Sequence, residues 1–138
     1  MKNVYSENLV KTASPAKLIE MLYEKSIELL NDAKQELEKE DFIATNERIK
    51  RVQDIVTELN LSLDMEKGGN IAASLRALYN YIYRLLIEGN TKRNPEKIDE
   101  ASFYFKELLE AWRSAMKAVG NTANMKSDQG ESHFNVSI

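Results

Sequence analysis

Apolar residues recur at alternating spacings of three and four positions in four segments of this 138-residue chain. Residues at these spacings lie on one face of an α-helix, and a helix with one apolar face buries it against other helices. The predicted faces are Ile19, Tyr23, Ser26, Leu30, Ala33 and Leu37; Phe42, Thr45, Ile49, Val52, Val56, Leu59 and Leu63; Ile71, Leu75, Leu78, Ile82 and Leu85; and Ile98, Ala101, Phe105, Leu108, Trp112, Ala115 and Val119. The pattern therefore predicts an all-α protein, a four-helix bundle with one core.

Capping residues and glycines mark where these helices should begin and end. Ser14-Pro15 and Asn94-Pro95 each place a capping side chain before a proline that suits the first helical position. Asp41 should cap the second helix, and Gly68-Gly69-Asn70 should break the chain before the third helix, with Asn70 as its cap. Gly89-Asn90 should end that helix. Such short connections favour an antiparallel, up-down-up-down order.

The two ends of the chain lack the helical period. Residues 1–13 read as an N-terminal arm before a bundle spanning 14–119. Residues 120–138 are rich in Gly, Asn, Ser and acidic residues, which predicts a flexible, disordered tail. The last part of that tail, Phe134 to Ile138, is less polar. It is interpreted either as a short docking motif or, in preference, as a solvated terminus.

Composition narrows the possible chemistry. The net charge is -3, 30% of the residues are charged, and there is no cysteine. No dense Lys/Arg cluster suggests nucleic-acid binding, and no apolar run reaches the roughly 20 residues of a membrane span. The only histidine, His133, lies in the tail, outside any helix that could present a metal or phosphorelay site. We therefore expect a cytoplasmic protein that is not an enzyme, with no cofactor, no metal, no nucleic acid and no membrane insertion.

The helices carry more apolar residues than four single faces require. Tyr79 and Tyr83 are one turn apart, and Leu86 continues their row beside the predicted face of the third helix. Two interpretations stay open. These residues widen the buried face, or they line grooves that accept a partner's amphipathic helix, a role that suits tyrosine because its ring packs while its hydroxyl stays in water.

Several short motifs occur in an order that resembles the flagellar secretion chaperones of the FliS family. The N-terminal motif is Tyr5-x-x-Asn8-x-Val10-x-Thr12-Ala13-Ser14-Pro15, followed by Leu18-Ile19-x-Met21-Leu22-Tyr23. The later ones are Gln53-Asp54-Ile55-Val56-x-Glu58-Leu59, Gly68-Gly69 with Ile71-Ala72, Leu75-x-x-Leu78-Tyr79-x-Tyr81, and Leu108-x-x-Ala111-Trp112. Together they span Tyr5 to about Val119.

The resemblance implies a cytoplasmic chaperone that binds the C-terminal region of flagellin, prevents its premature polymerisation and keeps it competent for flagellar type III export. It also implies that the arm packs on the bundle in the free protein, and that its tyrosine contacts an export-gate protein. The partner-binding residues expected on this basis are Tyr5, Val10, Thr12, Ala13, Ile55, Leu59, Leu63, Tyr79, Tyr83 and Leu86. The alternative is a self-associating helical scaffold or adaptor without flagellin specificity, and a homodimer of the free protein stays possible.

Overall fold

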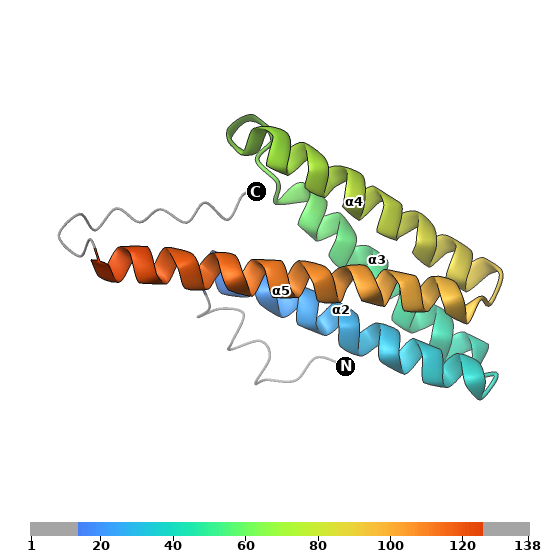
Figure 1. The fold of residues 1–138 in the computed structure, drawn as a ribbon. Helices are drawn as coiled ribbons and strands as arrows, with labels where there is room; N and C mark the ends of the chain where they lie inside the picture. Colours follow the sequence, from blue (N-terminus) through green and yellow to red (C-terminus); the bar gives the residue numbers. More distant parts are fainter. Residues whose placement is uncertain (1–13, 126–138) are drawn as a thin grey trace.

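The computed structural model describes residues 14–125, with side chains to residue 120. In chain order the helices are α2 (Pro15–Glu38), α3 (Phe42–Leu61), α4 (Met65–Thr91) and α5 (Pro95–Met125). Successive helices run in opposite directions, and α2 and α4 each pack mainly against α3 and α5 (Figure 1). The predicted all-α, up-down-up-down four-helix bundle is confirmed.

Three of the four predicted helix starts are confirmed. Ser14 Oγ accepts a hydrogen bond from the Lys17 backbone N–H at 3.2 Å, and Pro15 occupies the first helical position. Asp41 accepts from the Ala44 N–H at 3.1 Å. Asn94 accepts from the Glu96 N–H at 2.9 Å, directly before Pro95. In each case a side-chain oxygen satisfies a backbone donor that has no partner inside the helix.

The predicted start of the third helix is wrong. Asp64, not Asn70, is the N-cap of α4, and its carboxylate accepts from the N–H groups of Glu66 and Lys67. One helical turn follows before the chain kinks at Gly69, where φ is 53° and ψ is -130°. Only glycine adopts that combination without strain. The predicted break at the glycine pair is confirmed, because α4 consists of two helical segments that meet at this kink.

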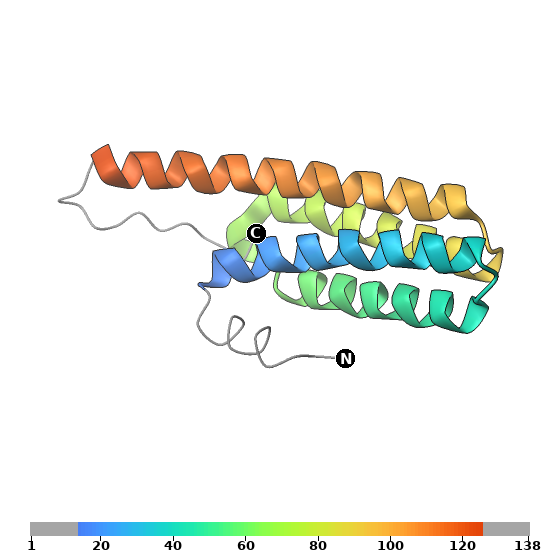
Figure 2. The same cartoon turned by 90° about the horizontal axis from the view of Figure 1, so that it is seen from below.

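The predicted end of this helix is also wrong. Gly89 lies within α4, which continues to Thr91, and the positive φ falls on Arg93 at 51°. Gly89 instead permits close packing, because a Cβ atom there would stand 3.1 Å from Ile98 Cγ1 on α5. The last helix likewise ends later than expected. It continues past Val119 to Met125, so its final turns extend beyond the other helices (Figure 2).

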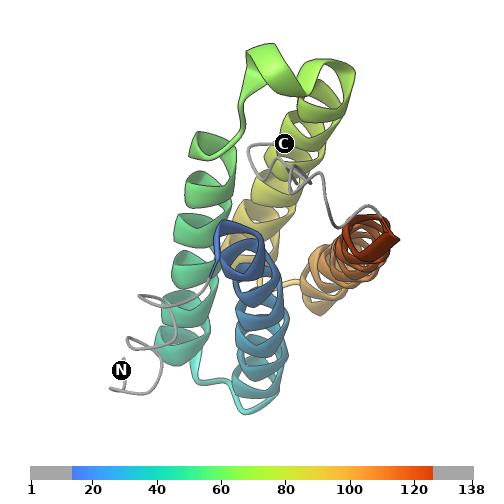
Figure 3. The ribbon, with the colours of Figure 1, turned by 90° about the vertical axis from the view of Figure 1, so that its left-hand side faces the viewer.

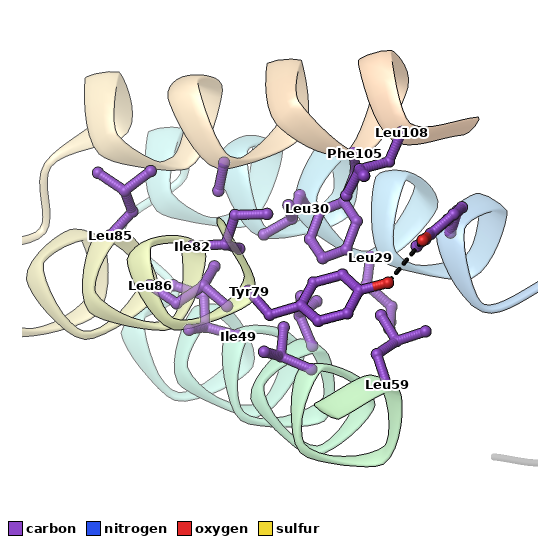
Figure 4. Packing of buried hydrophobic residues seen from close by; sticks show 14 of the residues in the cluster. Leu29, Leu30, Ile49, Leu59, Tyr79, Ile82, Leu85, Leu86, Phe105 and Leu108 are labelled. Carbon is purple, nitrogen blue, oxygen red and sulfur yellow. Dashed lines mark hydrogen bonds between the residues drawn. The ribbon is translucent and has the colours of Figure 1, made fainter. Parts of the chain in front are cut away.

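Packing confirms the predicted faces of α2, α3 and α5 but shifts that of α4. The buried positions on α4 are Ala72, Tyr79, Ile82, Leu85, Leu86 and Gly89. Tyr79 and Leu86, assigned to a second stripe by the sequence, point into the centre of the bundle (Figure 4). Ile71, assigned to the core, is 60% exposed. Within residues 14–125 no helix has both the length and the apolar character that a membrane crossing requires.

Candidate functional site

An apolar stripe on α4 begins in the core and emerges onto the surface. Ile71, Leu75, Leu78 and Ile82 are spaced by four, three and four residues, so they share one side of the helix. Ile82 is fully buried, Leu78 and Leu75 are half-buried, and Ile71 is 60% exposed. The first half of α4 therefore presents large aliphatic side chains that its neighbours cover only in part.

The apolar face of α5 also becomes partly exposed towards the end of that helix. Leu108 is 9% exposed, and two and three turns later Ala115 and Val119 are half-buried although they continue the apolar face of the helix. We call the surface formed by Ile71, Leu75, Leu78 and Ala115, beside the buried Leu108, the open face. It lies at the end of the bundle where α4 begins and α5 ends, and there the two helices are well separated (Figure 3).

The two helices are close at their other ends. The Tyr81 hydroxyl donates to Glu100 at 2.7 Å, and the rings of Tyr81 and Tyr104 meet edge to face with centroids 5.7 Å apart. Further along, Gly89 lets α4 approach Ile98. From this tightly packed end the helices diverge, as Figure 1 shows. The separation at the open face is therefore local.

Side-chain hydrogen bonds explain the divergence. At the open end α4 is tied to α3, because Arg76 donates to the Asn60 carbonyl at 2.9 Å and Asn60 donates to the Asn80 side chain at 3.1 Å. By contrast, α5 is tied to α2. Trp112 Nε1 donates to the Ala16 carbonyl at 2.9 Å, and Arg113 donates to Glu20 at 2.8 Å.

Arg113 and Glu20 also form an ion pair. The side chain of Glu20 is only 10% exposed, and Arg113 also contacts Glu24. The hydrogen bond from Arg113 lowers the pKa of the Glu20 carboxyl below its usual value, although burial acts in the opposite direction. An ionised Glu20 thus holds α5 against α2, on the side away from α4.

The core beside the open face is closely packed. The hydroxyls of Tyr23 and Tyr79 lie 2.6 Å apart, and the Tyr23 ring meets Trp112 edge to face with centroids 6.2 Å apart. Burial raises the pKa of Tyr23 to about 12, and burial raises the pKa of Tyr79 too. Both hydroxyls therefore stay protonated near neutral pH and act as structural hydrogen-bonding groups.

Known proteins share this sequence over most of its length. A family model described as "Flagellar protein FliS" matches residues 1–119. The chain belongs to the FliS family. Among its relatives, the flagellar secretion chaperone FliS of Campylobacter jejuni is 41% identical over 111 residues, which cover 80% of this chain and 87% of that protein.

Two further relatives are similar over comparable lengths. The flagellar secretion chaperone FliS of Salmonella typhimurium is 36% identical over 108 residues, 78% of this chain and 80% of that protein. The one from Bacillus subtilis is 32% identical over 114 residues, 83% of this chain and 84% of that protein. The FliS family is one of secretion chaperones rather than enzymes.

The structure separates the residues that the FliS resemblance suggested for partner binding. Leu59, Leu63, Tyr79 and Leu86 are at most 8% exposed and belong to the core. Of the two interpretations left open by the sequence, the structure supports a widened buried face for Tyr79, whose hydroxyl pairs with that of Tyr23 in the core. Ile55 on α3 and Tyr83 on α4 are half-buried at the edge of the core. The role of all six residues in binding stays a prediction.

The arm residues expected to bind a partner, namely Tyr5, Val10, Thr12 and Ala13, lie outside the described part of the chain. The residues that sequence reasoning missed are Ile71, Leu75 and Leu78, which it placed in the core. Their spacing is the same whether a neighbouring helix covers them or not, so periodicity carries no signal that could have found them.

The open face suits binding by packing. Its side chains are aliphatic, and among residues 14–120 no group of three or more His, Asp or Glu side chains is placed to hold a metal ion. A partly exposed row of large aliphatic residues one helical turn apart, with Ile71 at its exposed end, fits the apolar side of an amphipathic partner helix.

Proposed function

We propose that this chain is a flagellar export chaperone whose client is the C-terminal region of flagellin, and that the open face binds an apolar helix of that client. The observation that carries the proposal is the emergence of the α4 stripe from the core, from a fully buried Ile82 to a 60% exposed Ile71. Membership of the FliS family and the names of the relatives support the class of function.

The spacing of its side chains suits the open face to a helix with one apolar side. A helix with apolar residues at positions i, i+4 and i+7 matches the spacing of Ile71, Leu75 and Leu78. Burying these side chains removes apolar area from water at about 25 cal/mol per Å², which offsets the cost of ordering the client. A client whose own apolar side is covered cannot use it for subunit contacts, so premature polymerisation is prevented.

One face is too small to hold an unfolded client firmly, because ordering a bound segment costs about 2–5 kcal/mol or more. We therefore propose that the client also contacts the half-buried edge residues Ile55 and Tyr83. The N-terminal arm joins α2 at Ser14, the end of the bundle that carries the open face. In this proposal Val10, Thr12 and Ala13 pack on the bundle until the client arrives, and Tyr5 contacts the export gate in the cytoplasm.

Calorimetry with the C-terminal segment of the cognate flagellin tests the proposal. We expect Ile71→Ser, and the double variant Leu75→Ser with Leu78→Ser, to weaken binding at least tenfold. The control is Ile43→Ser with Ile87→Ser, because those side chains are 77% and 45% exposed but lie outside the open face. Ile71→Ser should keep the melting temperature of the parent, since Ile71 is mostly exposed.

Two outcomes would overturn this function. One is the absence of flagellin binding at micromolar protein concentrations. The other is equal weakening by the control variant, which would show general loss of apolar surface rather than use of the open face. A stable dimer in sedimentation that ignores flagellin would favour the self-associating scaffold.

A further inference from the structure

We infer that the C-terminal segment of this same chain, Phe134 to Ile138, docks on the open face and occupies it until a client displaces it. The docking concerns this chain alone, and only the competition with a client rests on the proposed function. Its basis is the partly exposed stripe on α4 together with the composition of the segment, the place where α5 ends and the length of chain that follows.

The segment has the pattern needed to cover a short apolar stripe. Phe134, Val136 and Ile138 alternate with Asn135 and Ser137. In an extended conformation the three apolar side chains point to one side and span roughly 13 Å. The three aliphatic residues of α4 span roughly 10 Å, from Ile71 to Leu78, at the rise of a helix. The apolar rows thus match in length and in number of side chains.

The chain between α5 and this segment has the right length. Because the rings of Tyr81 and Tyr104 are in contact, these two residues lie at the same height along the bundle axis. Counting ten residues in opposite directions along the antiparallel helices places Ile71 at the height of Ser114 on α5. From there to Met125 the helix rises by roughly 17 Å, and from the level of Leu78 it rises by roughly 27 Å. Residues 126–133 reach back at most roughly 26–29 Å when extended. The reach exceeds the axial distance to Ile71 by roughly 9–12 Å, which is available for the sideways step from α5 to α4, and the segment can continue towards Leu78.

The composition of this connecting stretch fits a spacer. Residues 126–133 are Lys, Ser, Asp, Gln, Gly, Glu, Ser and His, without a large apolar side chain. Large apolar residues reappear only at Phe134, where the reach of the chain coincides with the open face. The C-terminal segment is also better placed than the N-terminal arm, because it leaves from α5, which forms one side of the face. The arm leaves from α2, which packs mainly on α3 and α5.

The absence of cysteine in this chain allows a direct test by disulfide trapping in the full-length protein. The test pair is Ser74→Cys, an exposed position beside Leu75, with Asn135→Cys. The control pair is Lys25→Cys with Asn135→Cys. Lys25 is exposed and follows Glu24, which contacts Arg113, so it lies at a similar height along the bundle but on α2. Oxidation of dilute protein is followed by gel mobility and by mass spectrometry.

We expect the Ser74→Cys pair to form an intramolecular disulfide at least tenfold faster than the Lys25→Cys pair. Adding Phe134→Ser and Val136→Ser should remove that advantage, whereas Ser137→Ala should keep it. Equal rates for the two pairs, or an advantage that survives the Phe134→Ser and Val136→Ser changes, would overturn the inference. So would disulfides only between two molecules, which would indicate that a second copy covers the face.

A competition measurement then links the docking to client binding. If the segment occupies the open face, Phe134→Ser with Val136→Ser should raise the affinity for the flagellin segment severalfold, and Ser137→Ala should not change it. If trapping succeeds but the Phe134→Ser with Val136→Ser variant binds the flagellin segment no more tightly than the parent, the segment docks without competing with the client. Failure of flagellin to bind the parent protein would contradict the proposed function and leave the trapping result in place.

Discussion

The hydroxyl oxygens of Tyr23 and Tyr79 lie 2.6 Å apart in the centre of the bundle and join α2 to α4. These helices face each other diagonally, and each packs mainly against α3 and α5. Both tyrosines are at most 2% exposed. A hydrogen bond between two buried hydroxyls is favourable only while both partners are present, because a single buried hydroxyl has lost its water without replacement.

Removing one hydroxyl should therefore cost more than removing both. We expect Tyr79→Phe to lower the free energy of unfolding by about 1–3 kcal/mol, the penalty of an unpaired buried polar group. Tyr23→Phe with Tyr79→Phe should recover most of that loss. Chemical denaturation of the parent, both single variants and the double variant gives the coupling energy. Simple addition of the two single effects would contradict the pairing.

Alkaline pH should destabilise the protein through the same pair. Burial raises the pKa of Tyr23 to about 12, above the value of about 10 in an unfolded chain, and raises the pKa of Tyr79 as well. The unfolded state thus loses protons first, so stability is full below about pH 10 and falls as the pH rises from about 10 to 12. Each tyrosine contributes at most about 1.4 kcal/mol per pH unit. The double Phe variant should show a much flatter profile in urea unfolding across this range.

The contact of Arg113 with Glu20 should stabilise the bundle more than an exposed ion pair does. Arg113→Met leaves a carboxylate that is only 10% exposed without its strongest donor, whereas Lys34→Met removes the exposed pair between Lys34 and Asp99. We expect Arg113→Met to lower the melting temperature clearly more than Lys34→Met. Equal decreases would indicate that the Glu20 contact is an ordinary surface pair.

The same contact predicts an acid dependence. Hydrogen bonding to Arg113 lowers the pKa of Glu20 in the folded protein, so its contribution to stability is present above the unfolded pKa and is lost as the pH falls through the folded value. Thermal unfolding between neutral pH and about pH 3 should therefore fall less steeply in Glu20→Gln than in the parent. An identical slope would show that other carboxylates account for the acid sensitivity.

Substitution of the two adjacent glycines should have opposite effects. Gly69 has a φ of 53°, where an L-residue is strained, although a Cβ there would meet no atom within 4 Å. We expect Gly69→Ala to destabilise the protein by about 1–3 kcal/mol through backbone strain alone. Gly68 lies in the first turn of α4 and has no positive φ, so Gly68→Ala should be neutral or slightly stabilising. Thermal unfolding of both variants measures the difference.

Much of the fold follows from local rules. The starts at Ser14, Asp41 and Asn94 depend on side chains that accept from a backbone N–H two or three residues later, which a sequence displays directly. The faces of α2, α3 and α5 are also readable, because each has a single best apolar row. The error in the buried face of α4 has a specific cause. The first half of this helix carries two parallel rows, Ile71-Leu75-Leu78 and Ala72-Tyr79, and periodicity cannot tell which one its neighbours bury.

The candidate site depended on tertiary structure for the same reason. The amino-acid sequence alone determined the all-α class, the four antiparallel helices, the helix starts at Ser14, Asp41 and Asn94 and the motifs of the FliS family, since these rest on patterns among residues near one another in the chain. Only the packing decided that Tyr79 and Leu86 lie in the core and that Ile71 lies at the surface. Side chains far apart in sequence, Arg113 with Glu20 and Arg76 with Asn60, draw α5 towards α2 and α4 towards α3, and the open face is what that divergence leaves uncovered.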